Sequence, residues 1–362
     1  MREAASLTIV VPTYNERGNI RPLLEALDRN LSVGDWKVIF VDDDSPDKTA
    51  GEVQMCQSTY SNVELISRVG RRGLSSACIE GFTVATTPFV AVIDADLQHD
   101  ESVLIEMLRL LRDGKAEMVV GTRFKGFGST GAGLPPLRKF ISQSAALLTR
   151  IFFRVEMSDP MSGFFMMKRE VFNQVSHKLS AVGFKIMMDL VINHRGKLSV
   201  MEVPYTMRAR HAGESKLDWA VAFEYVAMLI SLRLNKLVSP AFVTFSAVGS
   251  VGLFVHAVVL YFVSFYQQTT FLASQGVATF VAMTTNFFLN NEITFRRKKL
   301  HGHAMLPGLL SFYVVCSLGA VINLAISQLL YSAGAFYMVA GISGALLAAV
   351  WNYLTTSKSV WR

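Results

Sequence analysis

Two long stretches without a charged side chain limit what this chain can fold into. Residues 237–291 and 300–357 contain no Asp, Glu, Lys or Arg, and each stretch is long enough for two membrane-spanning helices of about 20 residues. The 362-residue chain is 51% hydrophobic and only 17% charged, which is too apolar for an ordinary soluble enzyme. We therefore expect a soluble domain at residues 1–217, a linker at 218–236 and a membrane domain at 237–362. The four expected membrane helices lie at about 240–265, 271–295, 305–331 and 336–353.

Basic residues outside these helices predict how the chain crosses the membrane. The run 296–299 consists of Arg and Lys only, and Lys358 and Arg362 lie in the C-terminal tail. The connectors 266–270 and 332–335 contain no Lys or Arg. Because basic residues collect on the cytosolic side, we expect both termini and the N-terminal domain in the cytosol, in a protein that crosses the lipid bilayer several times.

The linker 218–236 carries apolar residues at helical spacing, followed by Arg233 and Lys236. The apolar positions are Val221, Tyr225, Met228, Leu229 and Leu232. This pattern predicts an amphipathic helix in the headgroup region of the membrane. A linker helix packed on the soluble domain is the alternative.

The positive charge of the chain is concentrated in its membrane part. The net charge is +7; residues 218–362 contain 8 Lys and Arg against 3 Asp and Glu, and residues 1–217 contain 27 against 25. The excess therefore lies where anionic lipid headgroups would be, and we expect no nucleic-acid partner. The cysteines Cys56, Cys78 and Cys316 are far apart in sequence and form no metal-type or redox pair, which fits a reduced compartment.

The N-terminal half alternates short β-rich runs with helix-compatible segments. The runs are 7–11, 37–41, 63–67, 89–93 and 118–120. This alternation predicts an α/β fold with a mostly parallel sheet covered by helices on both faces. Ligands bind at the carboxyl ends of the strands in such sheets. The residues that follow each run are therefore candidates for the functional site.

Polar or acidic residues follow four of these runs, at 12–16, 42–47, 94–100 and 121–123. Each could serve turn formation, because Asp, Ser and Pro begin turns and helices. Asp94 and Asp96 favour a binding role, since two carboxylates at the end of a buried strand repel each other unless a cation lies between them. A divalent ion there would neutralise a diphosphate leaving group.

These motifs together resemble the inverting GT-A-type glycosyltransferases, and among them the dolichol or polyprenyl phosphate mannose synthases. The motifs are Val-Pro-Thr-Tyr-Asn-Glu at 11–16, Val-Asp-Asp at 41–43, Asp-Ala-Asp-Leu-Gln-His at 94–99, Gly-Thr-Arg at 121–123, Ser-Asp-Pro at 158–160, Ser-Gly-Phe at 162–164 and Gly-Glu-Ser-Lys-Leu at 213–217. The membrane half resembles the GtrA-like four-span domain. The resemblance rests on residues 286–295 and 352–361, each an asparagine-containing helix end followed by an aromatic and a basic residue.

The resemblance implies which residues bind each part of the substrates. The positions implied for the base and ribose are Pro12, Tyr14, Glu16, Val41 and Asp43. Those implied for the sugar-diphosphate are Asp94, Ala95, Asp96 and Gln98, with Asp96 and Gln98 as ligands of Mg²⁺ or Mn²⁺. Those implied for phosphate groups of donor and acceptor are Arg123, Arg210 and Lys216, with Arg138 added on the acceptor side.

The implied reaction is transfer of mannose from GDP-mannose to dolichyl or polyprenyl phosphate, with inversion. Two departures from the family pattern, Met161 and Ala209, leave the sugar open, so that UDP-glucose or another nucleotide-sugar is the first alternative. A processive polysaccharide synthase is disfavoured because the chain lacks a Gln-x-x-Arg-Trp motif. A lipid-linked-sugar translocation partner is the non-enzymatic alternative. The glycine-rich loop 124–136 is expected to order when a substrate binds.

Overall fold

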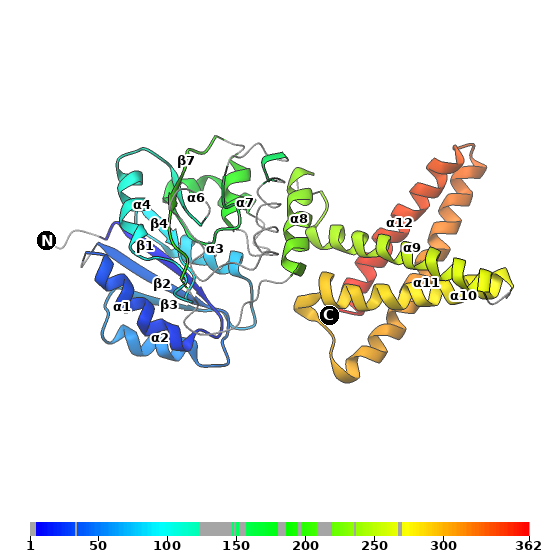
Figure 1. The fold of residues 1–362 in the computed structure, drawn as a ribbon, viewed down its shortest axis with the longest axis horizontal. Helices are drawn as coiled ribbons and strands as arrows, with labels where there is room; N and C mark the ends of the chain where they lie inside the picture. The colour runs from blue at the N-terminus through cyan, green and yellow to red at the C-terminus, as the bar shows by residue number, and fades with distance from the viewer. Residues whose placement is uncertain are drawn as a thin grey trace. The chain divides into compact units, whose positions relative to one another are not determined.

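A computed structural model of the chain describes residues 5–32, 35–123, 147, 149–151, 157–179, 186–194, 197–208, 219–234, 237–266 and 270–361. The chain divides into two compact units, Met1–Asp218 and Trp219–Arg362. The first unit is built of strands and helices, and the second is helical (Figure 1).

The described part of the first unit forms a seven-stranded sheet in the order β3-β2-β1-β4-β6-β5-β7. Its strands are β1 (Leu7–Thr13), β2 (Trp36–Asp42), β3 (Val63–Ser67), β4 (Phe89–Val92), β5 (Met118–Thr122), β6 (Phe165–Lys168) and β7 (Val200–Pro204). All pairs are parallel except those of β6, which runs antiparallel to β4 and β5. The predicted α/β fold with a mostly parallel sheet is confirmed. The five predicted runs match β1 to β5, whereas β6 and β7 were not predicted.

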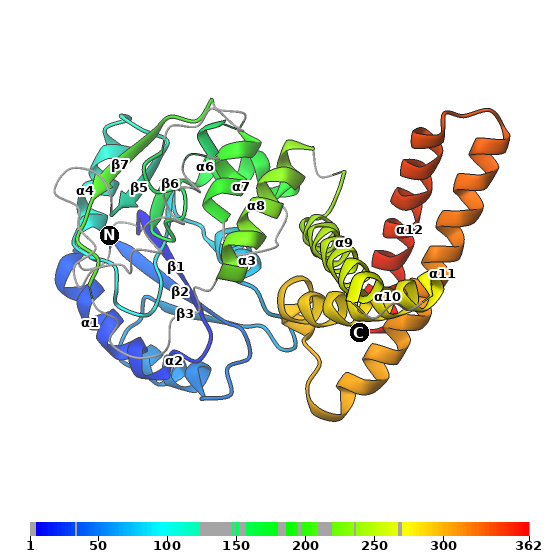
Figure 2. The ribbon, with the colours of Figure 1, turned by 45° about the vertical axis from the view of Figure 1, so that its right-hand side comes forward.

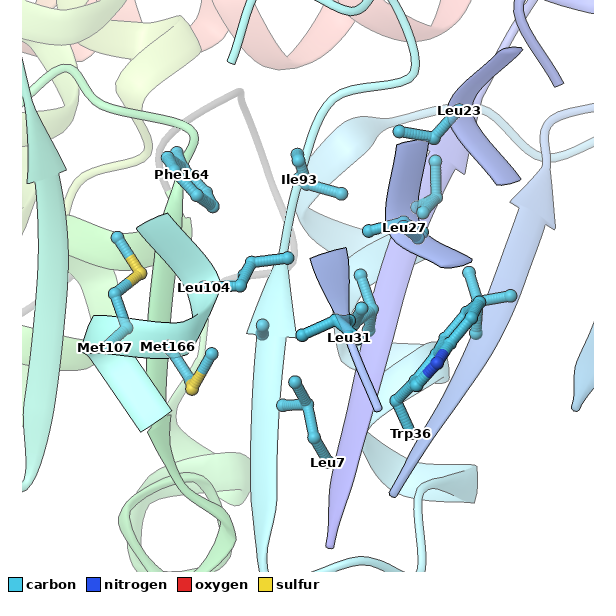
Figure 3. Packing of buried hydrophobic residues seen from close by; sticks show 14 of the residues in the cluster. Leu7, Leu23, Leu27, Leu31, Trp36, Ile93, Leu104, Met107, Phe164 and Met166 are labelled. Carbon is cyan, nitrogen blue, oxygen red and sulfur yellow. The ribbon is translucent and has the colours of Figure 1, made fainter. Parts of the chain in front are cut away.

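Side chains alternate between the two faces of the sheet along each strand. Because both faces carry apolar side chains, helices cover both of them. The helices are α1 (Ile20–Asn30), α2 (Thr49–Gln57), α3 (Leu74–Val84), α4 (Val103–Arg112), α6 (Arg169–Val175) and α7 (Ile186–Asn193). Leu7, Ile9 and Val11 of β1 belong to the apolar core that α1 and α4 complete (Figure 3). Val10 points to the other face and meets α3 at Gly81.

Gly81 allows α3 to lie close to β1, and this contact gives a test of the packing. A Cβ atom at position 81 would overlap the Val10 side chain. Gly81→Ala is therefore expected to lower the free energy of unfolding by about 1–3 kcal/mol, although alanine favours a helix. Gly51→Ala in α2 is the control, since its nearest neighbour would be the Lys48 Cβ at 4.0 Å. Thermal unfolding in detergent measures both, and equal melting temperatures would contradict the close contact.

The second unit consists of five long helices within the described residues. They are α8 (Trp219–Arg233), α9 (Pro240–Tyr266), α10 (Phe271–Leu289), α11 (Met305–Ser332) and α12 (Tyr337–Ser359). Figure 2 shows α11 and α12 side by side. Three helices in the described part are long and apolar enough to cross a membrane, at Pro240–Phe265, Gly302–Ser332 and Met338–Ser359.

The second predicted span, 271–295, is shorter as an α-helix in the structure. The helix α10 ends at Leu289, and a π-helical turn, Asn290–Thr294, follows. Polar contacts stabilise this turn: Asn290 Nδ2 donates to the Asn286 carbonyl at 2.9 Å, and Thr294 Oγ1 donates to Asn290 Oδ1 at 2.8 Å. Beside it, the buried Trp361 stacks on Phe295 and donates its indole N–H to Asn291 Oδ1 at 2.9 Å.

Two pairs of successive helices in the second unit, α9 with α10 and α11 with α12, meet at a glycine opposite an asparagine. A Cβ atom at Gly252 of α9 would overlap the Asn286 side chain of α10, and one at Gly319 of α11 would overlap that of Asn352 of α12. Glycine at these positions lets the helices approach closely, as in other membrane helix pairs. We take α9 with α10 and α11 with α12 as two antiparallel hairpins.

The helix α8 covers most of the predicted amphipathic linker. Its apolar side chains Tyr225, Met228, Leu229 and Leu232 are buried, whereas Phe223 is exposed. A position of α8 at the membrane surface stays a prediction, and so does the alternative, packing on the soluble domain.

Candidate active site

Three neighbouring strands end together at the carboxyl edge of the sheet. The strand β1 pairs with β2 on one side and with β4 on the other, and the chain reverses its order of strand addition at this point. Such a switch point is where α/β sheets bind ligands. It brings together Pro12 in the last part of β1 and Tyr14 just after it, Asp43 after β2, and Asp94 with Asp96 after β4.

Of the two acidic residues at the end of β2, Asp42 stabilises the local turn. Its carboxylate accepts from the Ser45 amide at 3.0 Å, the Ser45 hydroxyl at 2.6 Å and the Thr13 hydroxyl at 3.1 Å. Asp43 instead accepts from the Gly73 amide and from Arg68 Nη1, both at 2.6 Å. Burial raises the pKa of Asp43 above its usual value, although Gly73 and Arg68 offset part of the rise.

Arg68 is a buried arginine at this edge that the sequence analysis did not single out. Besides Asp43 it donates to the Gly73 carbonyl at 3.2 Å and to Ser76 Oγ at 2.6 Å. Nearby, the Arg72 guanidinium lies 4.5 Å from the Tyr14 ring centroid, a cation–π contact. Arg68 follows β3 directly, so the rule that identified the other strand ends could also have found it.

The acidic loop after β4 holds the residues expected to bind the sugar-diphosphate. Asp94 Oδ2 lies 3.2 Å from His99 Nε2, and Asp96 is buried and accepts from the Gln98 amide at 3.2 Å. Leu97 between them has φ +61°, a conformation that β-carbon-bearing residues seldom adopt and that is frequent at functional sites. The carboxylate of Asp94 also lies against Gly163, where a Cβ atom would stand 3.0 Å from Oδ2.

The donor atoms of this loop fit a hard divalent cation. No group of three or more His, Cys, Asp or Glu side chains suited to a metal is found in the described part of the chain. Asp96 and Gln98 would instead supply two oxygen ligands, because the Gln98 Nε2 donates to the Arg208 carbonyl at 3.3 Å and leaves Oε1 as the ligating atom. Mg²⁺ is commonly held by one or two protein oxygens together with phosphate and water.

Arg123, directly after β5, forms a forked ion pair with Asp159. Its Nε lies 2.7 Å from Asp159 Oδ2 and its Nη2 lies 2.9 Å from Oδ1, and Asp159 is fully buried. Burial by itself lowers the pKa of Arg123, but Asp159 more than offsets this, and the net pKa is raised. Arg123 Nη1 also contacts Met207 Sδ at 3.7 Å, and the next residue, Arg208, is hydrogen-bonded to Gln98 of the acidic loop. The arginine and the acidic loop are therefore linked by one short segment of the chain.

Several other predicted positions differ in what they offer a ligand. Val41 and Ala95 are buried, so they would contribute backbone atoms rather than side chains. Glu16 Oε2 accepts from Asn19 Nδ2 at 2.7 Å. The remaining predicted site residues, Arg138, Arg210 and Lys216, lie outside the described residues, as do Ala209 and the loop 124–136.

Two family models match the chain, one in each unit. Residues 8–176 match glycosyl transferase family 2, and residues 244–361 match the GtrA/DPMS transmembrane domain. A dolichol-phosphate mannosyltransferase of Pyrococcus furiosus is 33% identical over 359 residues, which cover 98% of this chain and 99% of the relative.

Two shorter relatives match part of the chain. The dolichol-phosphate mannosyltransferases of Mycosarcoma maydis and Saccharomyces cerevisiae are 36% and 33% identical; each match covers 63% of this chain, and 79% and 87% of the respective relatives. Among solved structures, the glucosyl-3-phosphoglycerate synthase of Mycobacterium tuberculosis in complex with Mn²⁺, UDP-glucose and phosphoglyceric acid is 19% identical. The match has a TM-score of 0.49 and covers 63% of this chain and 80% of that chain.

Proposed function

The chain belongs to the dolichol-phosphate mannosyltransferases, and on this premise we propose that it transfers mannose from GDP-mannose to a dolichyl or polyprenyl phosphate with inversion. The observation that carries the proposal is the position of Asp94, Asp96 and Arg123 at one edge of the sheet, after the strands β4 and β5, which point the same way. Tyr205 links the two strand ends, because its hydroxyl contacts His99 of the acidic loop and its amide binds the Thr122 carbonyl beside Arg123. Acidic oxygens for a cation and a fixed guanidinium for phosphate are what a transfer between two phosphate-bearing substrates requires.

On the donor side, Asp43 and Tyr14 would border the base and ribose, and Asp94 the sugar-diphosphate. The ligands of a Mg²⁺ or Mn²⁺ ion would be Asp96 and Gln98. When bound, this ion supplies charge neutralisation to the departing diphosphate. Asp96 is buried and hydrogen-bonded to the Gln98 amide, so its carboxylate keeps its orientation before the donor arrives.

On the acceptor side, the lipid phosphate is already anionic near neutral pH and needs no strong general base. It needs cationic groups that hold two phosphates together against their repulsion. Asp159 accepts hydrogen bonds from both Nε and Nη2 of Arg123, which fixes the direction of the planar guanidinium. Arg210, Lys216 and Arg138 remain the predicted additional phosphate ligands. Direct attack by the lipid phosphate would invert the anomeric centre.

The chain is a membrane protein, and we infer four crossings with both termini in the cytosol. The family match to the transmembrane domain and three apolar helices support the membrane location. The contact of Gly252 with Asn286 supports a fourth crossing, because α10 pairs with α9 along much of its length. Each hairpin returns the chain to the side of the membrane on which the hairpin began. The basic run 296–299 lies between the two hairpins and predicts that this side faces the cytosol.

A donor screen tests the proposed substrate. Radiolabelled GDP-mannose and UDP-glucose are offered separately with polyprenyl phosphate and Mg²⁺ or Mn²⁺, and label is followed into the organic phase. We expect label from GDP-mannose to exceed that from UDP-glucose by at least about a hundredfold. Preference for UDP-glucose would replace the donor but keep the mechanism. No labelled lipid with any nucleotide-sugar would favour the translocation partner instead.

A further inference from the structure

The segment Tyr205–Arg208, which we call the strap, lies against the acidic loop 94–101. It leaves the sheet at the end of β7, which is separated from β4 by β6 and β5. The strap starts with the Tyr205 amide bound to the Thr122 carbonyl at 3.0 Å, at the end of β5. It then meets the loop after β4, so the chain returns along the carboxyl edge of the sheet toward the site.

Tyr205, the first residue of the strap, is linked to Asp94 through His99. The Tyr205 hydroxyl lies 2.8 Å from His99 Nδ1, and His99 Nε2 lies 3.2 Å from Asp94 Oδ2. An ionised carboxylate only accepts hydrogen bonds, so Nε2 carries the proton and donates. Nδ1 of a neutral imidazole then accepts from the tyrosine hydroxyl. Both rings are buried, and His99 stacks on Phe164 with ring centroids 5.0 Å apart, which leaves the imidazole one orientation.

Arg208, the last residue of the strap, binds Gln98 and the end of the acidic loop. The Arg208 amide donates to the Gln98 carbonyl at 2.8 Å, and Gln98 Nε2 donates to the Arg208 carbonyl at 3.3 Å. The Arg208 guanidinium donates to Glu101 Oε2 at 2.6 Å and to Asp100 Oδ1 at 2.9 Å. Glu101 is only 1% exposed, so this carboxylate anchors the arginine from inside the protein.

We propose that the strap positions the donor-binding loop, with Tyr205 setting the direction of Asp94 and Arg208 setting that of Gln98. Both are positioning residues: Tyr205 acts through His99, and the Arg208 guanidinium acts by anchoring the main chain that binds Gln98. That the loop binds the sugar donor rests on the proposed function. The positioning itself should affect any nucleoside diphosphate and divalent cation that bind to this loop. Partners that orient the ligands of a metal site commonly change its affinity or activity by about 10- to 100-fold when removed.

The test measures binding separately from turnover. Tyr205→Phe removes one hydroxyl, and Arg208→Gln removes the ion pairs with little change in size. Binding of Mn²⁺ in the presence of GDP is followed by the electron paramagnetic resonance signal of free Mn²⁺, with full-length protein in detergent. We expect each variant to bind Mn²⁺ about tenfold more weakly, and to show a raised KM for the nucleotide-sugar.

Matched controls separate positioning from general loss of contacts. Arg112 is 46% exposed against 47% for Arg208, and it also pairs with a carboxylate, Asp35, but at the amino edge of the sheet. Tyr353 shares a hydrogen bond with Ser239 at 3.0 Å in the second unit. Arg112→Gln and Tyr353→Phe should leave Mn²⁺ binding within about twofold of the wild type, because the Arg112 pair is exposed and neither residue belongs to the strap or the acidic loop.

Unchanged Mn²⁺ binding in folded Tyr205→Phe and Arg208→Gln would overturn the proposal, and so would an equal loss in the controls. Should either variant fail to fold, Arg208→Lys and Glu101→Gln make the same comparison, and Arg208→Lys is expected to retain more affinity than Arg208→Gln. A wild type that binds Mn²⁺ with GDP but transfers no sugar would refute the proposed function alone. The loss of binding in the strap variants would still be measurable.

Discussion

Replacing Asp96 by alanine is expected to lower kcat by at least about a thousandfold. Asp96 is the buried carboxylate of the acidic loop and the proposed cation ligand. A bound cation contributes several kcal/mol to the stabilisation of a departing diphosphate, and about 4 kcal/mol corresponds to that factor in rate. Turnover is measured as labelled sugar in the lipid phase, at saturating nucleotide-sugar and divalent ion.

Asp113→Asn is the control for this experiment. Asp113 is an exposed carboxylate paired with Arg109 and Lys115 at 3.7 and 3.3 Å, and it lies just after α4, away from the acidic loop in sequence. We expect its turnover to match the wild type. Asp96→Ala should also keep a wild-type melting temperature or exceed it, because a buried carboxylate is removed. Turnover of Asp96→Ala near the wild-type value would contradict a cation site at this loop.

Arg123→Met is expected to damage both the stability and the activity of the enzyme. It leaves Asp159 buried without its forked partner, and breaking a buried pair in this way costs about 3–5 kcal/mol. It also removes the proposed phosphate ligand. A large fall in the melting temperature together with loss of labelled lipid is therefore the expected result.

A double variant separates the two effects. In Arg123→Met with Asp159→Leu, neither charge of this pair remains, and apolar pairs can replace a buried ion pair without loss of stability. We expect the melting temperature to recover toward that of the wild type while sugar transfer stays absent. If transfer returned with stability, Arg123 would serve only the fold and the acceptor phosphate would have other ligands.

The part of the fold that follows local pattern was predictable. The first five strands alternate with helical segments, and each of these strands is apolar and bounded by turn residues. The common position of the candidate residues was predictable as well, because the polar residues after β1, β2, β4 and β5 lie at the carboxyl ends of strands that point the same way. The hydrophobic stretches likewise predicted the long helices of the second unit to within a few residues at most ends.

The antiparallel strand β6 shows why the rest was missed. It has only four residues, of which the first three are fully buried, so it has no alternation of polar and apolar residues to mark it. Because it runs in the opposite direction, it brings the residues before it to the functional edge. Asp159 and Gly163 reach the candidate site in this way. Their motifs at 158–160 and 162–164 were noted, but no role followed from the sequence, because the candidates were taken from residues after strands.

Contacts between distant segments were equally out of reach. His99 was visible in the motif at 94–99, but its link to Tyr205 depends on the return of the chain after β7, a strand that was not predicted. Arg208 and Glu101 are 107 residues apart. In the second unit, hydropathy located the helices, but the π-helical turn at Asn290–Thr294 depends on asparagine and threonine side chains bonding to the backbone and to each other.

The close approach of Gly163 to Asp94 offers a way to move a carboxylate without changing any charge. A methyl group at position 163 would displace Asp94 Oδ2 by a few tenths of an ångström, or shift the backbone by as much. Asp94→Asn, by contrast, would keep the shape and abolish the charge. The two substitutions together would show whether sugar transfer depends more on where this oxygen lies or on the charge that it carries.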